Sequence, residues 1–127
     1  MPVTLDMHDE NQILVLAITE PWTIAQLKSV YPTAISFLDR VPHKVNILID
    51  LTAMKHVPLP GLWDRNSPLV VHANSGEIAV AGASSYTRSL AEASFRLINF
   101  ERVHFFLNWS EAYRFLISQS PTQPTQP

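Results

Sequence analysis

The chain has 127 residues, of which 46% are apolar and 16% are charged, and this suits a single domain with enough apolar residues for a core. A net charge of −2 without a run of Lys or Arg excludes the footprint of a nucleic-acid binder, and the absence of cysteine excludes disulfides and thiolate sites. No apolar run approaches the roughly 20 residues of a membrane span, and the polar Met1–Glu10 is unlike a secretory signal, so we expect a cytoplasmic protein.

The first segment predicts a β-hairpin. Residues Val3 to His8 alternate between apolar and polar, which is the pattern of a strand with one buried face. Residues 13–18 are almost wholly apolar and predict a second strand. The residues between them, 9–11, have turn chemistry, so the two strands are expected to pair with each other.

A kinked helix is predicted next. Thr23 and Gln26 make a capping box, because each side chain can satisfy a backbone N–H that the first helical turn leaves unpaired. Pro32 removes one hydrogen bond and predicts a kink, and we expect the helix to end before Pro42. Its apolar face is formed by residues three and four apart, namely Ile24, Leu27, Tyr31, Ala34, Ile35 and Leu38.

Strands and helices then alternate to the end of the domain. Val45–Leu51 is a nearly continuous apolar run, typical of a parallel strand covered on both faces. We expect further strands at 78–81 and 103–107, and helices at 68–73 (ended by 74–76), at 85–97 with Leu90, Ala93 and Leu97 inward, and after the cap Asn108. The sequence thus predicts one α/β domain over residues 1–118, with a mixed sheet of about five strands packed by about four helices. Residues 119–127 contain only Ser, Thr, Gln and Pro and are expected to be a disordered tail.

Six short segments occur with a recognisable order and spacing. They are Tyr31-Pro32 in the kinked helix, Ile47-Leu48-Ile49-Asp50-Leu51-Thr52, Pro60-Gly61-Leu62, Ile78-Ala79-Val80-Ala81-Gly82, Phe105-Phe106 and Ser110-Glu111-Ala112. Over roughly Val3 to Ile117, they resemble the STAS domain of bacterial anti-sigma-factor antagonists and of sulfate-transporter tails, in particular its SpoIIAA-like branch.

This resemblance implies a regulatory, non-catalytic domain. Its partner would be a protein, such as a regulatory kinase or an anti-sigma-like protein, or a second copy of the chain in a homodimer. The low fraction of charged residues, 16%, is typical of surfaces that make broad protein contacts.

One departure from the family pattern concerns phosphorylation. The antagonists that this sequence resembles carry an Asp-Ser-Ser-Gly-Leu motif, in which a serine is phosphorylated by the partner kinase. Here Asp50-Leu51-Thr52 and Gly61-Leu62 keep the spacing, but the Asp-Ser-Ser positions are Pro58, Leu59 and Pro60. These three residues have no hydroxyl group, so the resemblance implies a retained fold without the phosphorylation switch.

Two candidate binding sites follow predicted strands. The loop after Val45–Leu51 lies at the carboxyl end of a central strand, where ligands bind in open α/β sheets. Its candidate partner- or ligand-binding residues are Met54, Pro58, Leu59, Pro60, Gly61, Leu62 and Trp63, although the apolar ones could simply cap the core. Free N–H groups at a helix start make Gly82, Ser84 and Ser85 a candidate anion site, but a serine acting as helix cap accounts for the same residues.

The sequence predicts no catalytic residue, no cofactor and no metal site. Gly82-Ala83-Ser84-Ser85-Tyr86 lacks the second glycine of the Gly-x-Ser-x-Gly motif, because Tyr86 occupies that position. Ser84 is therefore not the serine of a nucleophile elbow. The histidines, at 8, 43, 56, 72 and 104, have no metal-ligand spacing. We expect Asp50 to accept N–H groups from the turn that follows it, rather than to form an acid–base pair with Asp64.

Three functions remain open at this point. The favoured one is a protein-interaction domain. The second is a SpoIIAA-like binder of a lipid or another small hydrophobic ligand, because such domains are similar in fold to lipid-carrying proteins. The third, an enzyme, would need a cleft that gathers Asp50, Asp64, His56 or His72.

Overall fold

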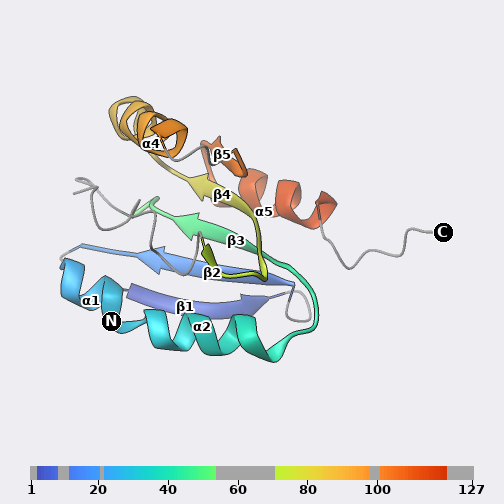
Figure 1. The fold of residues 1–127 in the computed structure, drawn as a ribbon. Helices are drawn as coiled ribbons and strands as arrows, with labels where there is room; N and C mark the ends of the chain where they lie inside the picture. The colour runs from blue at the N-terminus through green and yellow to red at the C-terminus, as the bar shows by residue number, and fades with distance from the viewer. Residues whose placement is uncertain (1–2, 9–11, 21, 54–70, 98–100, 120–127) are drawn as a thin grey trace.

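The computed structural model describes residues 3–8, 12–20, 22–53, 71–97 and 101–119, and its centre is a five-stranded sheet (Figure 1). The strands are β1 (Val3–His8), β2 (Ile13–Ile18), β3 (Val45–Asp50), β4 (Ser75–Ala81) and β5 (Val103–Phe106), and they lie side by side in this order. β1 pairs antiparallel with β2, whereas β2 to β5 are parallel. The predicted hairpin and the predicted mixed sheet are therefore confirmed.

The described helices are α1 (Ile24–Ser29), α2 (Tyr31–Arg40), α4 (Ser85–Leu97) and α5 (Trp109–Ser118). The capping box is confirmed: the Gln26 N–H donates to Thr23 Oγ1 at 3.1 Å, and the Thr23 N–H donates to Gln26 Oε1 at 2.8 Å. The predicted kinked helix is instead two helices, α1 and α2, that meet at Val30. Pro32 lies in the first turn of α2, where its missing N–H removes no intrahelical bond, so it starts a helix rather than bending one.

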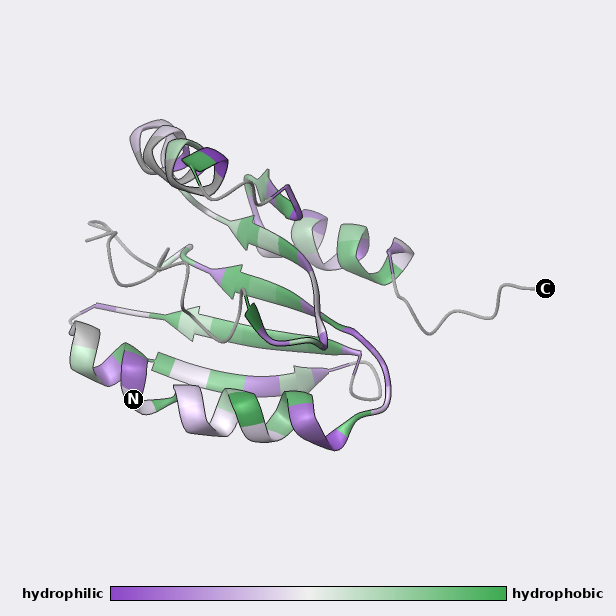
Figure 2. Cartoon of the chain, in the orientation of Figure 1, coloured by the Kyte–Doolittle hydropathy of each residue, from purple (hydrophilic) through white to green (hydrophobic). Residues whose placement is uncertain are grey.

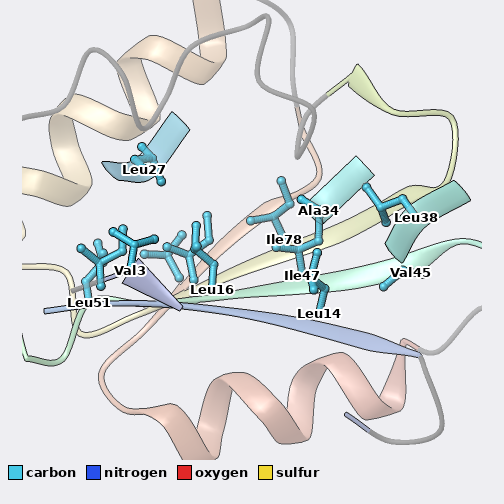
Figure 3. Close-up of a cluster of buried hydrophobic side chains, with 13 residues drawn as sticks. Val3, Leu14, Leu16, Leu27, Ala34, Leu38, Val45, Ile47, Leu51 and Ile78 are labelled. Atoms are coloured by element: carbon cyan, nitrogen blue, oxygen red, sulfur yellow. The ribbon is translucent and has the colours of Figure 1, made fainter. Parts of the chain in front are cut away.

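Helices cover both faces of the sheet. On one face, Leu27 of α1 and Ala34 and Leu38 of α2 pack on strand residues that include Leu16 and Ile47 (Figure 3). On the other face, the residues of α5 that pack on the sheet are Ala112 and Leu116, and their partners include Ile13, Val15, Leu48, Ala79 and Ala81. We call these the α1–α2 face and the α5 face. Because β2, most of β3 and the second half of β4 are apolar on both faces, these stretches are coloured mainly as hydrophobic in Figure 2.

Some predicted boundaries and faces are wrong. Residues 75 and 76 open β4 instead of ending a helix, because the Val45 N–H donates to Asn74 O at 2.6 Å and brings this segment beside β3. Leu107 lies past the end of β5 and is 83% exposed. Ile35 is 40% exposed, because α2 turns the narrower stripe of Ala34 and Leu38 inward. The predicted helix at 68–73 lies mostly outside the described residues.

The inward face predicted for the helix at 85–97 is also wrong where it can be judged. Ala93 is exposed, and Leu97 is 85% exposed. Leu97 is the last residue of α4, and neither core cluster of described residues includes a residue of this helix. The burial of Leu90 lies outside what the structure describes.

A buried amide joins α5 to the sheet at the start of β3. The Asn46 side chain is in the α5 face, and the residue is 1% exposed. Its Nδ2 donates to Leu116 O at 3.1 Å and to Gln119 O at 3.2 Å, and its Oδ1 accepts the Glu77 N–H at 2.9 Å. One side chain therefore satisfies carbonyls at the end of α5 and a backbone N–H of β4, which a buried apolar residue could not do.

Candidate interaction site at the carboxyl edge of the sheet

The parallel strands β3, β4 and β5 end together, and we call the residues at and just after these ends the carboxyl edge. At the end of β3, Asp50 Oδ1 accepts the Thr52 N–H at 2.9 Å and the Thr52 hydroxyl at 2.6 Å. The Leu51 N–H donates to Ala81 O at 2.9 Å, which ties this turn to β4. The predicted structural role of Asp50 is confirmed, and Asp64 lies outside the described residues.

The turn role of Asp50 leads to a testable expectation. Asp50→Asn should change the free energy of unfolding by less than about 0.5 kcal/mol, because an amide oxygen can accept both Thr52 bonds. Asp50→Ala should lower it by about 1 kcal/mol, because both donors lose their partner at a partly exposed position. Urea denaturation followed by circular dichroism measures both values. Equal losses in the two variants would show that the negative charge, and not the acceptor, is what the turn requires.

Gly82 holds the ends of all three strands close together. Its φ is +83°, in the left-handed region that favours glycine. A Cβ at this position would lie 2.7 Å from Thr52 Cα and 2.8 Å from Thr52 N, so the backbones of the two turns touch. The Gly82 N–H donates to Phe106 O at 3.0 Å, at the end of β5.

The first turn of α4 begins at this edge. Ser84 O accepts the Arg88 N–H at 2.8 Å, so Ser84 is in the capping position and Ser85 is the first helical residue. Ser84 and Ser85 are exposed. Of the three residues of the candidate anion site, Gly82 already uses its N–H within the sheet. An anion at Ser84 and Ser85 stays a prediction.

A surface pocket of about 210 Å³ opens between the first turns of α4 and α5. Its lining residues are Ala83, Ser85, Arg88, Phe105, Phe106, Leu107 and Glu111. The Arg88 guanidinium lies 5.5 Å from the centre of the Phe105 ring and 3.3 Å from Glu92 Oε2. The pocket therefore combines aromatic rings and an exposed leucine with charged groups of both signs at its rim, the kind of surface that receives an apolar side chain of a protein partner.

The sequence did not reveal this pocket. Leu107 was predicted to lie in the last strand, and Arg88 was not among the predicted site residues. One signal was available, because Leu107 precedes Asn108, whose Oδ1 accepts the Glu111 N–H at 2.9 Å and starts α5. An apolar residue placed between a strand end and a helix cap lies at the edge where loops meet.

A scan against models of protein families finds no match, and neither does a search among curated proteins. Among solved structures, the chain is similar to an anti-sigma-factor antagonist (STAS) domain protein from Planctomyces limnophilus. The likeness covers 91% of this chain and 97% of that one, with a TM-score of 0.54 and 13% sequence identity. The chain has the STAS fold. The resemblance predicted from the six segments is thus confirmed at the level of the fold.

The loop that the resemblance singled out cannot be placed on this STAS fold. Its residues Met54, Pro58, Leu59, Pro60, Gly61, Leu62 and Trp63 lie outside the described residues, and their binding role stays a prediction. This loop follows β3 at the carboxyl edge. The candidate site is therefore described only through the residues of this edge that the structure places. None of the helices described is long and apolar enough to cross a membrane.

The described histidines have local partners in this STAS fold. His72 Nδ1 accepts the Asn74 N–H at 2.9 Å, which leaves Nε2–H to donate to Asp39 Oδ1 at 2.6 Å. His104 Nε2 lies 2.8 Å from Glu77 Oε1, and its ring contacts Phe115. Within the described ranges, no three side chains of the metal-binding types gather in one place.

Proposed function

We propose that this chain is a non-catalytic regulatory domain that binds a protein partner through the carboxyl edge of its STAS fold. The observation that carries this proposal is the pocket beside Leu107, whose side chain is 83% exposed at the meeting point of β5 and α5. An exposed leucine beside two phenylalanines forms a small apolar centre with a polar rim. Such a centre is the usual core of a protein contact.

The proposal includes a loss of control by phosphorylation at the usual position. Pro58, Leu59 and Pro60 offer no hydroxyl there, so the partner would not be released by a phosphate at these residues. A regulatory kinase, an anti-sigma-like protein and a second copy of the chain are the partner classes that the resemblance implies.

The two other functions have less support. Three pockets lined by described residues have volumes of about 160, 210 and 240 Å³, and each is below the roughly 300–1,000 Å³ of typical small-molecule sites. A lipid site would have to be completed by residues outside the described ranges. An enzyme would need a cleft that gathers Asp50, Asp64, His56 or His72. Of these, Asp50 uses its Oδ1 in the turn, and Asp64 and His56 lie outside the described residues.

Leu107→Asp tests the proposed surface. The purified full chain, immobilised through its N-terminus, captures partners from a lysate of the source cells, and mass spectrometry quantifies them. A carboxylate placed at the centre of an apolar contact should weaken capture by about tenfold or more. Leu97→Asp is the matched control, because Leu97 is equally exposed at 85% but does not line the pocket.

The control should capture as much partner as the unchanged chain. If Leu107→Asp and Leu97→Asp capture alike, the carboxyl edge is not the binding surface. If the partner is a second copy of the chain, sedimentation should give the mass of a dimer for the unchanged chain and half that mass for Leu107→Asp. A parallel pair of variants, Leu59→Asp and Trp63→Asp, tests whether the loop after β3 belongs to the same surface.

A further inference from the structure

The strand β1 leaves one outer edge of the sheet open. It is the outermost strand on one side of the sheet, as β5 is on the other (Figure 1). An edge strand directs the backbone N–H and C=O groups of every second residue away from its neighbour, where another strand can bind them. Among the residues that the structure describes, Val3–Met7 have no hydrogen-bond partner on this outer side.

The common protections of an edge are largely missing from β1. Proline, lysine, a bulge or a very short strand usually keeps an edge from pairing with another chain. The six residues of β1 are Val-Thr-Leu-Asp-Met-His, and all six pair with β2 without a shift of register. β5, by contrast, has four residues. The charge that β1 carries at this edge is that of Asp6, which is exposed.

Partly exposed apolar side chains accompany this edge on the α1–α2 face. Leu5 and Met7 pack at the margin of the core there and stay partly exposed. A pocket of about 160 Å³ opens beside them, lined by Met7, Phe37, Arg40 and Val41. The Arg40 guanidinium lies 4.9 Å from the centre of the Phe37 ring. An apolar margin with a cation at its rim is typical of surfaces that a protein contact covers.

The residues of β1 are complementary to a second, antiparallel copy of β1. A two-fold axis perpendicular to the sheet keeps the same face of both copies on the same side, so odd-numbered residues lie opposite odd-numbered ones. With Leu5 opposite Leu5 of the second copy, Val3 lies opposite Met7, and Thr4 lies opposite Asp6. Apolar side chains then face apolar ones, and each carboxylate faces a hydroxyl group, which are favourable cross-strand pairs.

Asp6 favours this register over the neighbouring ones. A pair centred on Asp6 would place two carboxylates directly opposite each other, which is unfavourable. A pair centred on Thr4 would join only residues 3–5 of each copy. The register centred on Leu5 joins residues 3–7 and brings no like charges together. This self-complementarity favours a second copy of the chain as the occupant of the edge.

We propose that two copies of this chain associate through β1, antiparallel about a two-fold axis at Leu5, so that their sheets join into one continuous sheet. The carboxyl edge lies at the ends of β3, β4 and β5 and stays free in each copy, so the dimer presents two such edges to another protein. The inference is independent of the binding surface proposed above, because neither surface contains residues of the other.

Substitutions at the exposed Thr4 test the register with opposite signs. Thr4→Asp places carboxylates opposite each other at two positions of the dimer, and should weaken association in sedimentation equilibrium by about tenfold or more. Thr4→Lys places an ammonium group opposite each Asp6 and should strengthen association. Leu107→Asp adds the same charge as Thr4→Asp at the carboxyl edge, and should leave the dimer as stable as that of the unchanged chain.

Cysteine cross-linking locates the two-fold axis, because the chain has no cysteine of its own. Residues opposite each other in an antiparallel pair have Cα atoms about 4.5–5.5 Å apart, within reach of a disulfide. Mild oxidation should therefore convert Leu5→Cys into a covalent dimer on a non-reducing gel. Thr4→Cys alone should not form one, although residue 4 is more exposed, because its two copies are not opposite each other.

A mixture of Thr4→Cys chains with Asp6→Cys chains should cross-link, since these two positions are opposite. If Leu5→Cys does not fold, this mixture still decides the register, because both of its changes are at exposed positions. A monomer at every concentration would overturn the proposal, and so would cross-linking of Thr4→Cys alone as fast as Leu5→Cys. A dimer that Leu107→Asp abolishes and Thr4→Asp preserves would also overturn it, and would assign self-association to the carboxyl edge.

Discussion

Asn46→Leu is expected to lower the free energy of unfolding by about 3 kcal/mol, the sum expected when three hydrogen bonds of a buried side chain are lost. The change leaves the carbonyls of Leu116 and Gln119 and the N–H of Glu77 without their partner. These groups lie between α5 and the sheet, where water replaces the lost bonds poorly. Urea denaturation at neutral pH, followed by tryptophan fluorescence, measures the loss.

The variant Gln119→Ala is a control, because it also removes a side-chain amide at the end of α5, but an exposed one. Gln119→Ala removes a side chain that bonds the Ser118 hydroxyl at 3.4 Å on the exposed side of the helix end. Its effect should stay within about 0.5 kcal/mol, as for most surface changes. A small loss in Asn46→Leu, equal to that of the control, would mean that α5 is held by Ala112 and Leu116 alone.

Asn46→Asp adds a pH signature to the same prediction. The carboxylate keeps the acceptor for Glu77 but faces the carbonyls of Leu116 and Gln119, at the negative end of the α5 dipole. Its pKa should therefore lie above the unfolded value of about 3.9. A raised pKa favours the folded state when the group is protonated, so the variant should lose stability relative to the unchanged chain as the pH rises from about 4 to 7. A constant difference over this range would contradict the assigned contacts.

The strands could be predicted from the sequence because their signal is local. The apolar run of β2 correctly predicted a strand, and that of β3 correctly predicted a strand covered on both faces, since a parallel sheet between helices needs apolar side chains at every position. Asn46 interrupts the run at 45–51, and this was the missed signal. A polar residue in such a strand must find partners inside the protein, and its partners in α5 and β4 are far away in the sequence.

The candidate site was harder to predict for the same reason. The bonds between Asp50 and Thr52 span two residues, so turn chemistry predicted them. The pocket needs Arg88 from α4, Phe105 from β5 and Glu111 from α5 at one edge, and no spacing in the sequence encodes that meeting. The width of the buried face of α2 was overestimated. Apolar residues spaced three and four apart form a stripe that is wider than the part of the helix that the sheet covers, and Ile35 lies outside the covered part.

Gly82→Ala is expected to lower the free energy of unfolding by about 3 kcal/mol, and at the same time to alter the carboxyl edge. The left-handed backbone costs a residue with a Cβ about 1–2 kcal/mol, and overpacking against a fixed neighbour costs a similar amount again. The neighbour here is the backbone of Thr52, which cannot move without disturbing the turn held by Asp50. Urea denaturation gives the loss, and the amide signals of Thr52 and Ala53 report the shift of the turn.

Two further variants separate backbone strain from contact. Gly82→Asn carries a residue that tolerates the left-handed region but places a Cβ against the same Thr52 atoms, so it should lose nearly as much stability as Gly82→Ala.

Adding Thr52→Ser to Gly82→Ala removes the Thr52 methyl group, one of the three atoms within 2.8 Å of the new Cβ. It should recover less than half of the loss, because Thr52 N and Cα remain. Full recovery in the double variant would show that only the methyl group is in the way. A Gly82→Ala protein as stable as the unchanged chain would mean that the turns after β3 and β4 do not touch at Gly82 and Thr52. If the turns do touch, the folded fraction of Gly82→Ala should also capture less partner than Leu97→Asp, since the displaced turn lies on the proposed binding edge.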